Sequence, residues 1–120
     1  MNLPHSANKS IAVKLTFEFS LDIMHLCSQL DQGYKYSYSK QLFRSGTGIG
    51  ANVIEAQNAE SKKDFLHKIK IAAKEAEETE YWLLLGNQSE EYPDMKDYLD
   101  KLYAIKRVLN SIISTTKANL

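Results

Sequence analysis

Apolar residues recur every three or four positions along most of this chain, a spacing that is typical of amphipathic α-helices. The pattern predicts four helices, over residues 8–31, 37–59, 62–86 and 93–117. Between them lie Gly33, the polar stretch 58–61, and Gly86 followed by Pro93, all of which are turn-forming sequences. Since no segment shows the strict alternation of a half-buried strand, the sequence predicts an all-α fold.

Short connections force each helix to run back along the one before it. We therefore expect an antiparallel, up-down-up-down four-helix bundle that forms one domain over residues 1–120. Gly33 suits the C-terminal cap of the first helix, and Pro93 suits the first turn of the fourth. Ser61 and Asp64 have the spacing of a capping box at the start of the third helix. A chain this short buries roughly two-thirds of the surface of its unfolded form, so association with copies of itself would add stability.

The second helix contains the sequence RSGTGIGANVIEA, residues 44–56, which holds three of the five glycines of the chain. Gly46, Gly48 and Ala51 fit the spacing of a dinucleotide-binding loop, but such a loop follows a β-strand, and residues 37–43 are not strand-like. We interpret the glycines as part of a helix, where each costs about 1 kcal/mol relative to alanine. Close packing against other helices would offset that cost.

Two sides of this helix carry glycine. Gly46 and Gly50 lie on one side and Gly48 lies roughly opposite, so other helices can approach from two directions. Apolar residues also point to more than one side, and we expect the second side to be a subunit interface. The residues assigned to this interface and its structural motif are Arg44, Ser45, Gly46, Gly48, Ile49, Gly50, Asn52, Glu55 and Glu78.

A polar line on the same helix, which includes Asn52 and Glu55, has two interpretations. The first is a set of paired polar groups at a helix contact, with Arg44 or Lys40 as the counter-charge. The second is a functional polar pocket. We also expect Glu78 or Glu80 of the third helix to turn toward Arg44.

With these residues in hand, the sequence resembles a bacterial four-helix-bundle family encoded in intervening sequences of 23S rRNA genes. Its members are also labelled S23 ribosomal proteins, and they are related to the accessory variability protein of diversity-generating retroelements. The resemblance runs over about residues 17–114. The matching residues are Arg44 to Thr47, Ile49 and Asn52 to Glu55 in the second helix, and Ser61, Phe65, Leu66, Ala72, Ala73, Glu78 and Glu80 in the third.

The resemblance implies a bundle that assembles as a ring, a homopentamer. It also implies a partner class, because the retroelement relative is strongly basic and binds a reverse transcriptase and nucleic acid. The present chain departs from the family at Gly48, where serine is typical, and at Ala56, where glycine is frequent. It is also electrically neutral, with 15 basic and 15 acidic residues.

The charges are unevenly distributed along the chain. Alternating helix directions place most bases at one end of the bundle and a glutamate-rich set, which includes Glu75 to Glu80, at the other. In the third helix lysines precede glutamates, the reverse of what the helix dipole favours. The basic end is therefore our candidate surface for RNA, DNA or a nucleic-acid-processing protein. Its residues are Lys9, Lys14, Lys62, Lys63, Lys68, Lys70, Lys106, Arg107 and Lys117.

Other chemistry finds little support in the sequence. Cys27 is the single cysteine, and we expect it to be a small buried hydrophobe. The histidines lack the spacing of a helical metal site, and we expect no cofactor and no small-molecule substrate. Without a signal peptide or a membrane-spanning segment, the expected location is the cytoplasm.

The sequence therefore predicts a non-enzymatic, oligomeric assembly or binding module. One alternative is a purely structural oligomer, and another is an enzyme that uses Arg44, Asn52, Glu55 and Glu78. The tyrosine-rich connection 34–38 has two interpretations as well: its rings pack against the bundle end or a neighbouring subunit, or they stack on single-stranded bases.

Overall fold

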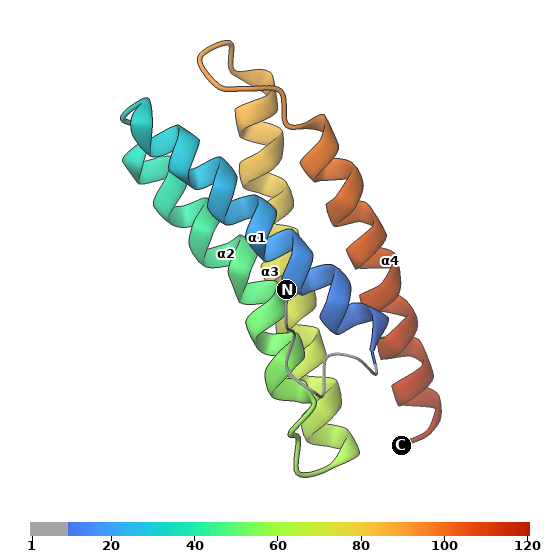
Figure 1. Cartoon of the computed structure of the whole chain (residues 1–120). Coiled ribbons are helices and arrows are strands. Elements are labelled where there is room, and N and C mark those ends of the chain that lie inside the picture. The colour runs from blue at the N-terminus through green and yellow to red at the C-terminus, as the bar shows by residue number, and fades with distance from the viewer. Residues whose placement is uncertain (1–9) are drawn as a thin grey trace.

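The computed structural model describes residues 10–120. This part of the chain contains four α-helices and no strand, which confirms the all-α class (Figure 1). The helices are α1 (Ile11–Gln32), α2 (Tyr36–Ala56), α3 (Lys62–Gln88) and α4 (Lys96–Ala118).

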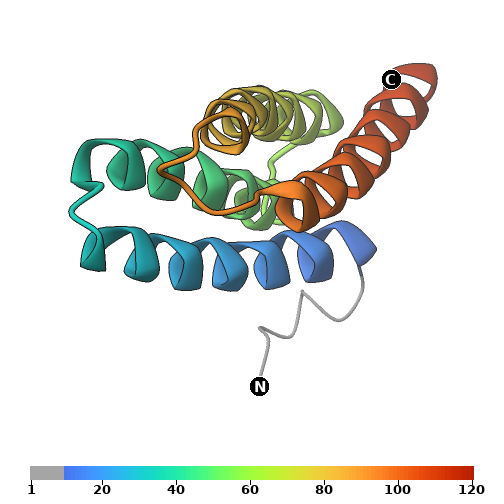
Figure 2. The ribbon, with the colours of Figure 1, turned by 90° about the horizontal axis from the view of Figure 1, so that it is seen from above.

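Successive helices run antiparallel, and each packs on the one before it (Figure 1). A further contact between α1 and α4 closes the bundle, and it is the smallest of these four helix contacts. Seen from above, α4 inclines away from α1 toward its C-terminus (Figure 2). The arrangement is thus up-down-up-down, with one loosely closed seam between α1 and α4.

The core follows the predicted apolar stripes. On α2 every member of the stripe is buried, and the small residues in it let the neighbouring helices come close. Fully buried side chains such as Phe19, Ile23, Leu83 and Leu109 each contribute roughly 1.5–3 kcal/mol through removal of apolar surface from water. The buried stripe of α2 is Leu42, Gly46, Ile49, Val53 and Ala56, and that of α3 includes Ile69, Ala72, Ala76, Thr79 and Leu83.

The side chains of Ser10 and Ser61 cap the starts of α1 and α3. The hydroxyl of Ser61 accepts a hydrogen bond from the Asp64 backbone N–H at 3.0 Å, and the Asp64 carboxylate accepts one from the Glu60 N–H at 3.1 Å. This is the predicted capping box, with its return bond shifted by one residue. Gly33 caps the end of α1, but the left-handed position of this turn belongs to Tyr34, whose φ is 62°.

Three helix boundaries differ from the prediction by three residues, because α1 begins at Ile11, α2 ends at Ala56 and α4 begins at Lys96. After Ala56 the backbone turns more tightly, with hydrogen bonds between residues three apart, so α2 ends three residues early. Pro93 lies before α4 rather than in its first turn. The Asn87 side chain accepts a hydrogen bond from the Met95 N–H at 2.9 Å, and this tie holds Met95 outside the helix.

Candidate functional site

The glycines of α2 mark close contacts with two helices. A Cβ at Gly46 would lie 3.0 Å from the side chain of Ile23, and a Cβ at Gly50 would lie 3.2 Å from the carbonyl oxygen of Thr16; both neighbours belong to α1. A Cβ at Gly48 would lie 2.5 Å from Oε2 of Glu75, on α3. Helices therefore approach α2 closely from two directions, as the glycine spacing indicates.

Both approaching helices belong to the same chain. Ser45, Gly46, Ile49 and Gly50 are buried between α1, α2 and α3 of one subunit. The close contacts on the two glycine-bearing sides of α2 are therefore made within one chain. Phe43, on the second apolar side of α2, is 44% exposed, so a contact with another subunit through that side stays a prediction.

Arg44 forms the polar centre of the contact between α2 and α3. It forms ion pairs with Glu78 and, at 3.6 Å, with Glu75, and so occupies the position expected from the sequence. Trp82 donates an indole N–H to Glu78 at 3.0 Å. Hydrogen bonds from Trp82 and then Arg44 lower the pKa of Glu78, whereas burial raises the pKa of Glu75 despite the nearby guanidinium.

The rest of the polar line is paired within the chain. Asn52 donates to the carbonyl of Gly48 at 2.8 Å, and Ser45 accepts from the Thr79 hydroxyl at 3.0 Å. Glu55 is exposed and pairs with Lys68 at 3.8 Å. Across residues 10–120, every buried side-chain nitrogen or oxygen has a hydrogen-bond partner. The line thus has the geometry of a satisfied helix contact.

A second charged group joins α3 and α4. Lys106 lies between Glu80, at 2.6 Å, and Glu77, at 2.9 Å. Its hydrogen bond lowers the pKa of Glu80. Burial opposes the charged form of Lys106, but the bonds to Glu80 and Glu77 prevail and raise its pKa. Lys106 is therefore part of an ion-pair network within the chain.

Several lysines of the predicted basic end have polar partners within the chain, and the other described members are exposed. Lys9 lies outside the described residues, Lys68 and Lys106 are in ion pairs, and Lys62 donates to the Asn119 carbonyl at 3.2 Å. Because α3 is 27 residues long, Glu75 to Glu80 lie near its middle rather than at an acidic end. The other predicted residues, Lys14, Lys63, Lys70, Arg107 and Lys117, are exposed.

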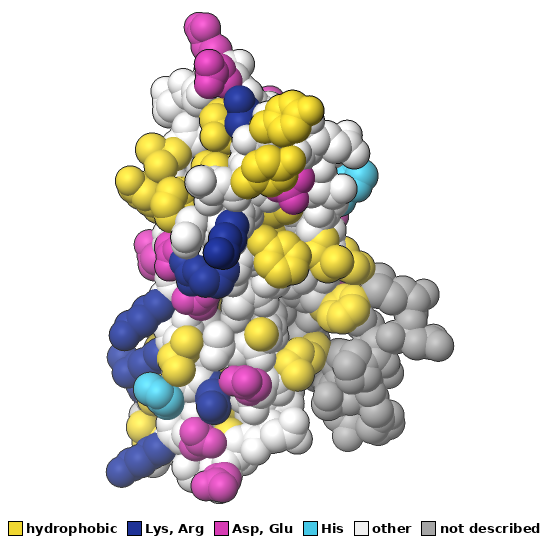
Figure 3. Space-filling view, turned by 90° about the vertical axis from the view of Figure 1, so that its left-hand side faces the viewer, with side chains coloured by type: hydrophobic (Ala, Val, Ile, Leu, Met, Phe, Trp, Pro, Cys, Tyr) yellow, Lys and Arg dark blue, Asp and Glu magenta, His cyan; other side chains and the backbone are white. Residues whose placement is uncertain are grey.

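Four exposed side chains form a row along the outside of α3. Lys63, His67, Lys70 and Lys74 follow at spacings of four, three and four residues, so they share one face of the helix. Figure 3 shows basic side chains and a histidine along one edge of the molecule. We call these four residues the basic row. Sequence reasoning missed Lys74 and His67, although the helical spacing could have revealed both.

Two apolar patches lie on the outside of the bundle. The α1–α2 patch consists of Leu21, Met24, Tyr36 and Phe43, with Met24 50% and Phe43 44% exposed. A shallow, open groove of about 460 Å³ lies on it, with Met24, Tyr36 and Phe43 among its lining residues. The α3 patch consists of Tyr81, Leu84 and Leu85, and both leucines are more than 40% exposed. In the face shown in Figure 3, hydrophobic side chains gather mainly over the upper half of the molecule.

Of the three tyrosines expected in the first connection, Tyr34 lies in it, whereas Tyr36 and Tyr38 lie in the first turn of α2. Tyr38 packs on Tyr92 and Trp82, with ring centroids 4.7 and 6.2 Å away, and its hydroxyl donates to the Trp82 carbonyl. Tyr34 and Tyr36 remain exposed. One of the three rings therefore anchors the connection to the end of the bundle.

Cys27 is a buried residue of the core, as expected. Its thiol donates to the Ser39 carbonyl at 3.4 Å, and burial raises its pKa. It therefore lacks the lowered pKa of a nucleophilic thiol.

Within residues 10–120 no three histidine, cysteine or acidic side chains are grouped so as to hold a metal ion. In the same part of the chain, no helix combines the length and apolarity needed to cross a membrane.

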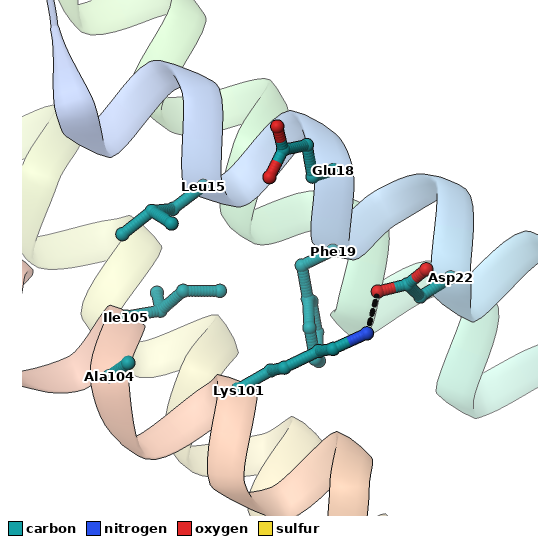
Figure 4. Close-up of a pocket in the computed structure, with 7 residues that line it drawn as sticks. All are labelled: Leu15, Glu18, Phe19, Asp22, Lys101, Ala104 and Ile105. Carbon is teal, nitrogen blue, oxygen red and sulfur yellow. Dashed lines mark hydrogen bonds and ion pairs between the residues drawn. The ribbon is translucent and has the colours of Figure 1, made fainter.

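A small hollow of about 260 Å³ lies in the loose seam between α1 and α4 (Figure 4). Its apolar wall is formed by Leu15, Phe19 and Ile105. At the rim, Lys101 pairs with Asp22 at 2.7 Å, so these two charges satisfy each other. The hollow is smaller than most ligand pockets, which hold roughly 300–1,000 Å³. We interpret it as imperfect packing between the two helices.

The fold and the glycine contacts define an antiparallel four-helix bundle with a tightly packed second helix. The family model described as 23S rRNA-intervening sequence protein matches residues 8–112, so the chain belongs to that family. This confirms the resemblance found in the sequence. No curated protein matches the chain significantly.

A solved structure supports the same relationship. It is a protein of unknown function from the S23 ribosomal protein family of Bacteroides thetaiotaomicron. It is 40% identical to this chain, and the match has a TM-score of 0.82 and covers 86% of this chain and 98% of the other. The similarity extends to nearly the whole of that protein.

Proposed function

We propose that this protein is a non-enzymatic assembly module that forms a closed ring of identical subunits. The observation that carries the proposal is the presence of two separate apolar patches on one small bundle. Exposed apolar surface of this kind, rimmed by polar residues, is a mark of protein contacts. The family resemblance implies five subunits.

The two patches differ in position and shape, which favours a head-to-tail contact. The α1–α2 patch contains a groove, whereas the α3 patch is made of side chains that project from one helix. If the α3 patch of one subunit enters the groove of the next, each subunit uses one copy of each surface. A contact between unlike surfaces forms a ring when its rotation closes.

The polar line supports a non-enzymatic role. Arg44, Asn52, Glu55 and Glu78 are each bonded to neighbours in the same chain. An active site of these residues would need a reactive group free to meet a substrate. Their arrangement instead suits a polar contact that holds α2 against α3.

Nucleic acid, or a protein that processes it, is the proposed partner of the ring. Residues 62–74 of α3 hold five lysines and one aspartate, although the positive end of the helix dipole already lies there. A ring would repeat this charge in every subunit, and the summed field would attract phosphates.

Size-exclusion chromatography with light scattering tests the assembly. The wild-type protein is expected to have a mass several times its chain mass of 13.7 kDa. Phe43→Glu and Leu84→Glu each place a charge in one patch and are expected to lower that mass. Ser111→Glu, on an exposed position of α4, is the matched control. A wild-type protein that has the mass of one chain would contradict the proposal.

A further inference from the structure

The side chains of the basic row lie in one line along the outside of α3. A helix rises about 1.5 Å per residue, so Lys63 and Lys74 are about 16 Å apart along the axis and successive members are about 4.5–6 Å apart. All four side chains are exposed on the face opposite the buried stripe of α3. The row therefore presents closely spaced donors in a single line.

The positive charge of this row is not neutralised inside the described chain. The ion pairs found in residues 10–120 include none of Lys63, Lys70 and Lys74. The nearest acids on α3 have other partners, because Asp64 caps the helix and Glu77 pairs with Lys106 of α4. Lys63 lies in the first turn of α3, where the helix dipole disfavours a cation, so local helix stability does not explain this residue.

We infer that the basic row binds the phosphate backbone of single-stranded nucleic acid. This inference rests on the proposed nucleic-acid role and names the surface that performs it. Lysine ammonium groups pair with phosphates as point charges, and a line of them follows one strand.

A single strand fits this surface better than a duplex. A duplex presents two phosphate strands across grooves roughly 6 or 12 Å wide, and binding both requires a second line of free bases. Beside the row, the seam between α2 and α3 holds Lys68 already paired with Glu55. One flexible strand can instead follow the single row along the convex helix.

Binding and assembly would use different parts of α3. Lys70 and Leu84 are about 21 Å apart along the helix axis. The row occupies the first half of the helix, and the α3 patch lies near its C-terminal end. A nucleic acid bound along the row therefore does not cover the α3 patch.

Fluorescence anisotropy with a short labelled oligouridylate, measured across a salt series, tests the inference. Each phosphate contact to a single strand contributes about 0.7 to the slope of log affinity against log salt. Replacing Lys63, Lys70 and Lys74 with glutamine is expected to reduce that slope by about 2 and to weaken binding at low salt. The control replaces Lys14, Arg107 and Lys117 with glutamine, which removes the same charge from exposed positions elsewhere.

The outcomes separate this inference from the wider proposal. If the row variant and the control weaken binding equally, or if a labelled duplex binds more tightly than the single strand, the basic row is not the binding surface for single-stranded nucleic acid. If a polyglutamate peptide competes as well as unlabelled oligouridylate, the surface is a general anion site and the inference is also wrong. If neither single strand nor duplex binds at low salt, the nucleic-acid role itself fails.

Discussion

Gly48 of α2 lies directly against the carboxylate of Glu75 on α3, where a Cβ would stand 2.5 Å from Oε2. The missing side chain leaves room for Glu75 to reach Arg44 across the helix contact. The same helix packs against α1 through Gly50, but there the nearest atoms include backbone. The two glycines therefore have different neighbours and should respond differently to the same substitution.

Alanine at Gly48 and at Gly50 is expected to have unequal effects on stability. Each change gains about 1 kcal/mol of helix propensity. At Gly48 the obstacle is the flexible end of Glu75, so the free energy of unfolding should change by less than about 1 kcal/mol. At Gly50 the Thr16 carbonyl is 3.2 Å from the new Cβ, so α1 must shift, and a net loss of about 1–2 kcal/mol is expected.

Urea unfolding of both variants provides the measurement. Ala51→Gly, on the exposed side of the same helix, is the control and should lose about 1 kcal/mol through propensity alone. Equal stability of the two alanine variants would show that backbone proximity at Gly50 has no special effect.

Replacing Glu80 with glutamine is expected to reduce the loss of unfolding free energy that occurs when the pH falls into the acid range. The pKa of Glu80 is lowered in the folded protein by Lys106, so its contribution is present above its ordinary value of 4.5 and is lost as the pH falls through the folded value. The pKa of Glu78 is also lowered, so Glu78 likewise makes the folded state less stable in acid. The pKa of Glu75 is raised, so Glu75 has the opposite effect on stability. Part of the acid sensitivity should therefore persist in Glu80→Gln.

Urea unfolding near neutral pH and near pH 3 would measure this difference. Glu80→Gln should be less stable than wild type at neutral pH, by about 1 kcal/mol, and the gap should close in acid. Asp100→Asn, at an exposed position of α4, is the control. A gap that stays constant between the two pH values would mean that the ion pair contributes nothing to the pH dependence.

Filling the hollow between α1 and α4 is expected to stabilise the bundle. Ala104 lines this hollow, and a leucine there would add contacts with Leu15 and Phe19 (Figure 4). Cavity-filling substitutions commonly add about 0.5–2 kcal/mol. Thermal unfolding of Ala104→Leu should therefore show a higher midpoint than wild type, with exposed Ser111→Leu as the control. A lower midpoint would mean that the seam is already tightly packed.

The sequence predicted the helices and their buried faces well, because both depend on local periodicity. The opposed positions of Gly46 and Gly48 and the approach of Glu78 to Arg44 follow from the same periodicity. It cannot show which helix covers a given face. The sequence therefore did not reveal that α3 of the same chain covers the Gly48 side of α2, while Phe43 on its second apolar side is left exposed.

The charge map was harder to predict, because it depends on the register between helices. Lys106 lies opposite Glu80 only because of how far α4 is displaced along α3, which local spacing does not encode. The start of α4 likewise depends on a bond between Asn87 and Met95 across the connection. The basic row, by contrast, lies on one helix, and its spacing is visible in the sequence.

The most direct test of the head-to-tail ring is to mix the two patch variants. Phe43→Glu keeps an intact α3 patch, and Leu84→Glu keeps an intact α1–α2 patch. Light scattering should therefore find single chains in each separate sample and a one-to-one complex of two chains in the mixture, because one intact contact of unlike surfaces is restored. A mixture that contains only single chains, beside a wild-type oligomer, would contradict the head-to-tail contact.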